Sequence, residues 1–108
     1  MSFRIVFSPE AEEQLAALYC YIAAASSPDI AARYTGAIVS YCESLCTFPQ
    51  RGTTREDVRP GLRIINYKKR AVIAFDVDAD CVSIIGVFYG GQDYETILQD
   101  DYEDGLTH

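Results

Sequence analysis

Histidine is scarce in this sequence, and closely paired cysteines are absent. Its one imidazole is His108, and its four cysteines, Cys20, Cys42, Cys46 and Cys81, include no Cys-X-X-Cys pair. A structural zinc site takes four thiolate or imidazole ligands at short spacing, so no metal site is expected. Because the cysteines stand in apolar patterns, we expect reduced core residues, with a disulfide or zinc role for Cys42 and Cys46 as the less favoured alternative. Nothing in the sequence indicates a cofactor.

Long apolar runs are also missing. No segment reaches the roughly 18 apolar residues that a membrane-spanning helix needs. The first seven residues have the pattern of a strand rather than that of a secretion signal, so we expect a cytoplasmic protein. The chain has 108 residues, of which 49% are hydrophobic. That length predicts one domain over residues 1–108 with a single core, too small to enclose a large cofactor.

Positive charge is absent from the last third of the chain. All nine Lys and Arg lie between Arg4 and Arg70, seven of them within residues 51–70, whereas residues 93–108 hold six acidic residues. The formal net charge of −7 disfavours direct binding of nucleic acid, because such a protein must neutralise phosphates. The asymmetry predicts separate basic and acidic surfaces, or an acidic tail that folds back on the basic stretch.

Two Ser-Pro-acid sequences predict the starts of two helices. Ser8 and Ser27 are placed as N-caps, and each precedes a proline and an acidic residue that suit the first turn of a helix. Apolar residues then recur at steps of three and four, as far as Ile22 in the first segment and Phe48 in the second. The short linker between the two segments predicts a helical hairpin.

Residues 3–7, 62–66, 71–77 and 81–89 have the pattern of strands. The last of these is apolar on both faces, which predicts a central strand covered on two sides. Its expected faces are Cys81, Ser83, Ile85, Val87 and Tyr89 on one side, and Val82, Ile84, Gly86 and Phe88 on the other. We expect turns at residues 67–69 and 78–80.

The remaining segments complete the predicted fold. Residues 50–61 are polar and indicate a loop that carries Arg51, Arg55 and Arg59 outward. Residues 100–108 are expected to form a frayed acidic tail. The predicted order is β-α-α-β-β-β, an α+β fold in which an antiparallel sheet packs against a helical hairpin.

This order, together with three short motifs, resembles the RelE/ParE toxin superfamily. The motifs are FPQRG at residues 48–52, PGLR at residues 60–63, and VFYGGQDYE at residues 87–95. The last motif is most similar to the ParE branch. The resemblance covers almost the whole chain and implies the toxin of a bacterial type II toxin-antitoxin pair, neutralised by a ParD-like antitoxin. It also implies that DNA gyrase is the target if the chain is ParE-like, or messenger RNA on the ribosome if it is RelE-like.

The RelE-like alternative can be tested on individual residues. The resemblance implies that RelE-type nucleases place lysines before, and an arginine within, their second strand, then an arginine and a tyrosine near the end. Arg63 matches the strand arginine, and Lys68, Arg70 and Tyr94 complete the nearest candidate set. At the later arginine position this chain has Gly-Gly-Gln. The candidate set is incomplete, so a gyrase inhibitor without catalytic residues is favoured, with a nuclease or a non-toxic antitoxin-binding module as alternatives.

The residues expected to contact a partner are mostly cations and the residues of the final motif. They are Arg51, Arg59, Arg63, Gln92, Asp93 and Tyr94. Arg63 is expected either to bind a carboxylate of the antitoxin or to form an ion pair with Asp93 or Glu95. The tyrosines of the two helices are interpreted as packing residues rather than as a platform for bases. The surface expected to bind the antitoxin is the sheet face and edge that the helices leave open.

Overall fold

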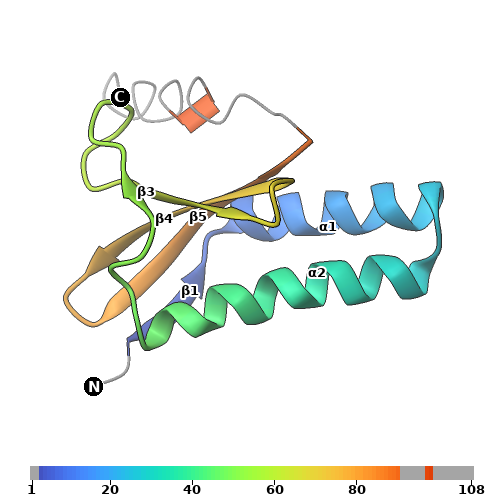
Figure 1. The fold of residues 1–108 in the computed structure, drawn as a ribbon, viewed down its shortest axis with the longest axis horizontal. Helices are drawn as coiled ribbons and strands as arrows, with labels where there is room; N and C mark the ends of the chain where they lie inside the picture. The colour runs from blue at the N-terminus through green and yellow to red at the C-terminus, as the bar shows by residue number, and fades with distance from the viewer. Residues whose placement is uncertain (1–2, 91–96, 99–108) are drawn as a thin grey trace.

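A computed structural model describes residues 3–90 and 97–98 of the chain (Figure 1). In chain order the elements are β1 (Arg4–Phe7), α1 (Pro9–Ala25), α2 (Pro28–Glu43), the 3-10 helix η1 (Ser44–Cys46), β2 (Thr53–Thr54), β3 (Arg63–Tyr67), β4 (Ala71–Asp78) and β5 (Cys81–Tyr89). The two helices form a hairpin that covers one face of the sheet (Figure 1). The predicted α+β class and helical hairpin are confirmed.

Both helices begin where their serines predict. Ser8 Oγ accepts the backbone N–H of Ala11 at 3.0 Å, and Ser27 Oγ accepts that of Ile30 at 3.2 Å. An N-cap of this kind stabilises a helix by about 1 kcal/mol. Ser8 Oγ also donates to the carbonyl oxygen of Ile85 at 3.0 Å. The first cap therefore attaches α1 to β5, an inner strand of the sheet.

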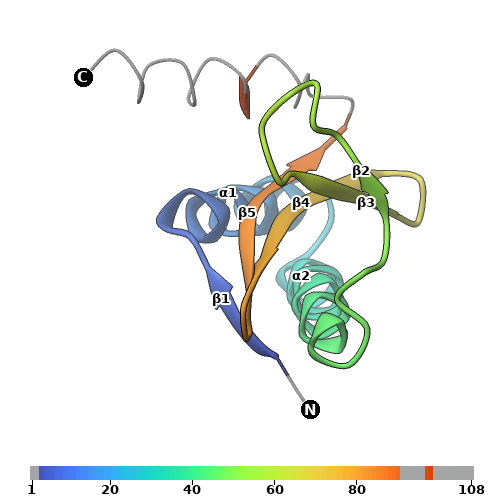
Figure 2. The same ribbon diagram turned by 90° about the vertical axis from the view of Figure 1, so that its left-hand side faces the viewer.

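The sheet is mixed rather than wholly antiparallel as expected. Its strand order is β1-β5-β4-β3-β2, and β1 pairs in parallel with β5, from Arg4 opposite Cys81 to Phe7 opposite Ile84. Figure 2 shows β1 and β2 at the two edges. Alternating burial shows which face a residue takes, but it carries no information on the direction of a neighbouring strand. The short β2 lies in the segment that was expected to be a loop.

A β-bulge in β5 changes the predicted faces of that strand. Ile84 and Gly86 pair with successive residues of β4, so that Ile85 is an additional residue. Ile84 and Val87 consequently pack on the hairpin side, although strict alternation put them on opposite faces. Ile85 and Phe88 pack on the other side. The alternation predicted for this strand is present on each side of the bulge, but the additional residue exchanges the two faces after it.

Both faces of the sheet are covered, as predicted for the central strand. On the face away from the helices the buried residues are Val58, Leu62, Ala74, Phe88 and Leu98. Leu98 is 3% exposed, and residues 97–98 lie across the sheet from the helices (Figure 1). Leu98 thus helps to cover the face opposite the hairpin.

The cysteine prediction is correct for only part of the set. Cys42 is fully buried in the main core, whereas Cys20 is exposed on α1 and was wrongly expected inside. Within residues 3–90 and 97–98, no three His, Cys, Asp or Glu side chains are grouped so that they could hold a metal ion. None of the described helices is long and apolar enough to span a bilayer.

Candidate partner-binding site

Five tyrosines form a row where the helical hairpin meets the sheet. The row runs Tyr21 (α1), Tyr89 (β5), Tyr34 (α2), Tyr67 (β3) and Tyr41 (α2), with successive ring centroids 6.4, 5.8, 6.3 and 5.2 Å apart. At such distances tilted and edge-to-face rings attract each other. The prediction that Tyr34 and Tyr41 are packing residues is confirmed. Tyr21, at the end of the row, is 64% exposed.

Arg51 lies at the other end of this tyrosine row. Its guanidinium carbon is 6.0 Å from the ring centroid of Tyr41 and 5.5 Å from that of Phe48, and its Nη1 donates to Ser44 Oγ at 3.4 Å. Cations are attracted to aromatic faces at these distances. Phe48 was predicted on the helical stripe, but α2 ends at Glu43, and Phe48 is 61% exposed.

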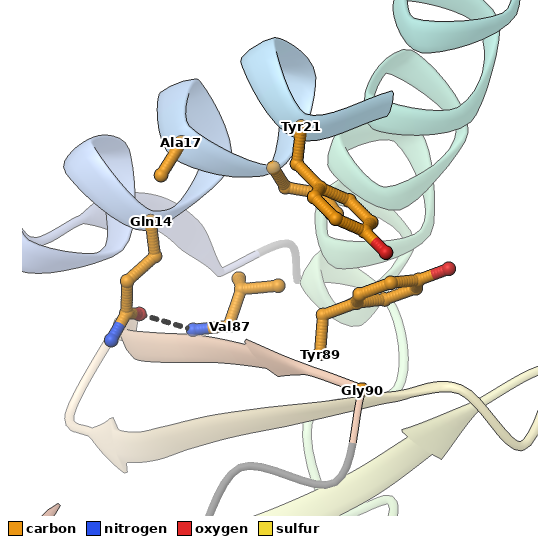
Figure 3. A pocket seen from close by; sticks show the side chains of 7 residues that line it. Gln14, Ala17, Tyr21, Val87, Tyr89 and Gly90 are labelled. Carbon is orange, nitrogen blue, oxygen red and sulfur yellow. Dashed lines mark hydrogen bonds between the residues drawn. The ribbon is translucent and has the colours of Figure 1, made fainter. Parts of the chain in front are cut away.

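A cavity of about 370 Å³ lies at the Tyr21 end of the row, between α1 and the end of β5 (Figure 3). We call it the tyrosine cavity, and its lining residues are Gln14, Ala17, Leu18, Tyr21, Val87, Tyr89 and Gly90. Figure 3 shows the rings of Tyr21 and Tyr89 facing each other on one side and Gln14 bonded to Val87 on the other. The cavity is therefore mainly apolar, with hydroxyl and amide groups among its walls.

The cavity follows from small side chains and from the bulge in β5. Ala17 on the helix and Gly90 on the strand fill little space. Gly90 has a φ of 72°, a conformation that glycine adopts without strain. Just after the bulge, the backbone N–H of Val87 donates to Gln14 Oε1 at 2.6 Å. Gln14 thus satisfies a buried donor and also forms the polar wall of the cavity.

Positive charge lies beside the cavity. The backbone oxygen of Arg70 accepts the N–H of Gly90 at 3.2 Å. A hydrogen bond between the side chains of Arg70 and Tyr89 raises the pKa of Arg70. Lys68 and Lys69 precede Arg70 in the β3–β4 turn, and the Lys68 ammonium is 5.5 Å from the Tyr67 ring centroid. Arg70 therefore adjoins the cavity, Lys68 adjoins the tyrosine row, and Lys69 is exposed in the same turn.

Tyr34 stands in the middle of the row with its hydroxyl buried. This hydroxyl has no hydrogen-bond partner among the described residues. Burial raises the pKa of Tyr34, and the neighbouring Tyr89 and Tyr67 raise it further, whereas Arg70 lowers it.

Arg63 lies at the start of β3 and holds the segment that follows η1. Its Nη1 donates to the backbone oxygens of Gln50 at 3.2 Å and Arg51 at 3.3 Å, and its Nη2 donates to Gln50 Oε1 at 2.7 Å. Arg63 and Arg51, both expected at the partner surface, are therefore brought together. Asp93 and Glu95, the expected ion-pair partners of Arg63, lie outside the described residues.

Arg59 is placed on the opposite face of the sheet. Its Nη2 donates to the backbone oxygen of Leu98 at 3.0 Å, so it points inward rather than outward as predicted for its loop. A second cavity, of about 550 Å³, has Arg59, Phe88 and Leu98 among its lining residues. Burial raises the pKa of Asp76, the nearby Asp78 raises it further, and Arg59 opposes both effects. The structure thus separates Arg59 from Arg51 and Arg63.

Comparison with known proteins identifies the family. The family described as "ParE toxin of type II toxin-antitoxin system, parDE" matches residues 5–94. The chain belongs to the ParE toxin family. The RelE/ParE resemblance predicted from the motifs is confirmed.

Solved structures of similar fold include chains from two toxin-antitoxin systems. A chain of the chromosomal ParDE toxin-antitoxin system from P. aeruginosa matches with a TM-score of 0.72 and 19% identity, over 82% of this chain and 96% of that one. A chain of the RelBE2 toxin-antitoxin complex from Mycobacterium tuberculosis matches with a TM-score of 0.61 and 18% identity, over 83% of this chain and 100% of that one. Among curated proteins none matches. At these identities the likeness concerns the fold.

Of the candidate nuclease residues that the structure describes in this ParE-family chain, Arg63 lies apart from Lys68 and Arg70. Arg63 is the first residue of β3, whereas Lys68 and Arg70 follow its last residue. At about 3.3 Å per residue, the Cα atoms of Arg63 and Lys68 are about 16 Å apart along the strand. Tyr94, like the expected partner residues Gln92 and Asp93, lies outside the described residues.

Sequence reasoning did not find the polar wall of the tyrosine cavity. One signal was present: Gln14 is three residues after Ala11 and four before Leu18, so a polar residue interrupts the apolar stripe of α1. Its acceptor role was not predictable, because Val87 is 73 positions away. Gly90, the described glycine of the final motif, has a positive φ, which indicates a structural role.

Proposed function

We propose that this ParE-family chain is neutralised by a cognate ParD-like antitoxin and that the free toxin inhibits DNA gyrase by binding it. The family match supports the toxin assignment. The similar P. aeruginosa structure carries the name of a ParDE toxin-antitoxin system, which supports a partner of the same kind here. Both proposed partners act in the bacterial cytoplasm, so we propose the same location for this chain.

The separation of the basic candidates is the observation that favours binding over RNA cleavage. Cleavage through a 2′-hydroxyl needs a proton acceptor, a proton donor and positive charge around one phosphate. Arg63 directs both of its terminal nitrogens at Gln50 and Arg51, and it is a strand's length away from Lys68 and Arg70. A protein-binding inhibitor requires no such cluster.

Two parallel assays test this proposal. Purified toxin is added to gyrase in a supercoiling assay, with and without the protein encoded beside its gene, and the same samples are added to ribosomes translating a defined messenger RNA. We expect the toxin to inhibit supercoiling, the neighbouring protein to relieve the inhibition, and the messenger to stay intact. Intact supercoiling at toxin concentrations that saturate the antitoxin would contradict the gyrase proposal.

A RelE-like nuclease is the second candidate, and one observation favours it. The similar fold of the RelBE2 chain is covered over its full length, and the β3–β4 turn of this chain offers Lys68 and Arg70 close together. If this candidate is right, the messenger is cut while gyrase is unaffected, and Arg70→Gln slows the cutting. Silence in both assays, with the antitoxin still bound, would instead indicate a non-toxic binding module.

The predicted contact residues remain proposals for the antitoxin interface. Arg51 and Arg63 occupy one end of the tyrosine row, and Arg59 is on the other face of the sheet. If the antitoxin wraps around the toxin, it can reach both places, and alanine substitution at each position would weaken binding. Gln92, Asp93 and Tyr94 are tested in the same titration.

A further inference from the structure

The tyrosine cavity has the size and lining of a receptor for one large side chain. Its volume of about 370 Å³ is at the lower end of the roughly 300–1,000 Å³ typical of small-ligand pockets. None of its lining residues is charged. Tyrosines at the rim of an apolar pocket are typical of the positions that dominate protein-protein binding energy. An apolar or aromatic side chain therefore fits the interior.

The positive charge beside the cavity indicates which residues should adjoin that side chain in the partner's sequence. The Arg70 side chain is hydrogen-bonded to Tyr89 of the lining, and no described carboxylate is paired with it. Lys68 and Lys69 have φ values of 51° and 63°, in a region where glycine or asparagine is favoured. Salt screens charges over about 8 Å, so these nearby cations act on a bound group more strongly than the net charge does.

Two described residues follow Gly90 in the chain, and neither lines the tyrosine cavity. After Gly90 the next described residues are Ile97 and Leu98, and Leu98 is buried on the face opposite the hairpin. Its carbonyl oxygen is held there by Arg59 at 3.0 Å. The cations beside the cavity are exposed, and their positive charge complements an acidic partner, so we take a partner as the occupant.

We propose that the tyrosine cavity receives one large apolar side chain of the antitoxin, and that a carboxylate next to that side chain pairs with Arg70. This inference rests on the proposed function, because the antitoxin is the partner it names. It predicts an antitoxin segment in which an aromatic or branched residue adjoins Asp or Glu. Such a segment combines apolar burial with a charge-assisted contact.

A small probe tests the cavity without the antitoxin. N-acetyltryptophan carries an aromatic ring beside a carboxylate, and N-acetyltryptophan amide lacks the charge. In NMR titrations we expect N-acetyltryptophan to shift the ring signals of Tyr21 and Tyr89, and to bind about tenfold more tightly than the amide. Arg70→Gln should remove that difference, whereas Lys69→Gln, which removes a charge from the same turn, should keep most of it. Absence of shifts at both tyrosines would overturn the inference.

A second pair of variants tests the cavity in the complex. Ala17→Leu fills the cavity from an exposed helix position, and Ala16→Leu adds the same side chain at the neighbouring exposed position outside it. We expect Ala17→Leu to weaken antitoxin binding about tenfold or more in a calorimetric titration, and Ala16→Leu to have little effect. A complex whose affinity neither Ala17→Leu nor Arg70→Gln changes contradicts this inference alone. A wild-type chain that forms no complex contradicts the proposed function.

Discussion

The hydrogen bond between Gln14 and Val87 connects the helical hairpin to the bulged strand, and Gln14→Leu would remove it. Val87 is 3% exposed, and its N–H donates to Gln14 Oε1 at 2.6 Å. A buried N–H left without a partner costs about 1–3 kcal/mol. Water entering the adjacent cavity would recover part of this. We therefore expect Gln14→Leu to lower the free energy of unfolding by about 1–2 kcal/mol, in the lower part of the range for an unpaired buried N–H.

Urea denaturation followed by circular dichroism measures this change. A loss of 1 kcal/mol corresponds to a decrease in Tm of about 4–8 °C for a small domain. Glu13→Leu is the matched control, because Glu13 is exposed and adjacent on the same helix, and it should change stability by less than about 0.5 kcal/mol. Equal stability of Gln14→Leu and the wild type would refute the idea that this bond holds the helix to the bulge.

Three further predictions concern a cap, a thiol and an arginine. Ser8→Ala should lower the free energy of unfolding by about 1–2 kcal/mol, and Ser27→Ala by about 1 kcal/mol or less. The reason is that Ser8 caps its helix and also donates to Ile85, whereas Ser27 only caps. Equal losses of stability in urea titrations would contradict this. Burial raises the pKa of the Cys42 thiol from 9.0 to about 12. As pH rises, the unfolded chain therefore loses this proton before the folded chain does, so the free energy of unfolding should fall between pH 9 and 12. In Cys42→Ala this fall should be shallower. An unchanged dependence of stability on pH in the variant would exclude Cys42 as a cause. Arg63→Ala should weaken antitoxin binding by about 1–3 kcal/mol. The control is Arg55→Ala, which removes an exposed ion pair with Asp57 and should leave antitoxin binding unchanged. If calorimetry shows the same affinity for Arg63→Ala as for the wild type, Arg63 is not part of the interface.

Features encoded in neighbouring residues were predicted correctly. The serine caps, the helical stripes except at Phe48, and the alternating strands up to the bulge in β5 each involve residues only a few positions apart. The turn between β3 and β4 was also placed correctly, although Lys68 and Lys69 have positive φ values there. The short motifs near residues 48–52, 60–63 and 87–95 identified the superfamily, and the family match over residues 5–94 confirms it.

The candidate site was predictable only in fragments. Tyr21, Tyr34 and Tyr89 were visible as aromatic residues, but their row depends on how α1, α2 and β5 pack. The partner-facing role expected for Arg59 did not anticipate its contact with Leu98. No local pattern records which distant backbone a side chain will meet, because the same side chain is compatible with many neighbours.

Local chemistry alone determined where helices and strands begin, which residues alternate into the core, and that the fold is α+β. Tertiary packing decided that β1 runs parallel to β5, that Ile85 bulges, and that Gln14 meets Val87. The physical reason is range: caps and periodicity act over one or two turns of chain, whereas sheet order and cavities arise from contacts between segments separated by tens of residues. The tyrosine cavity and the cations beside it belong to this second class.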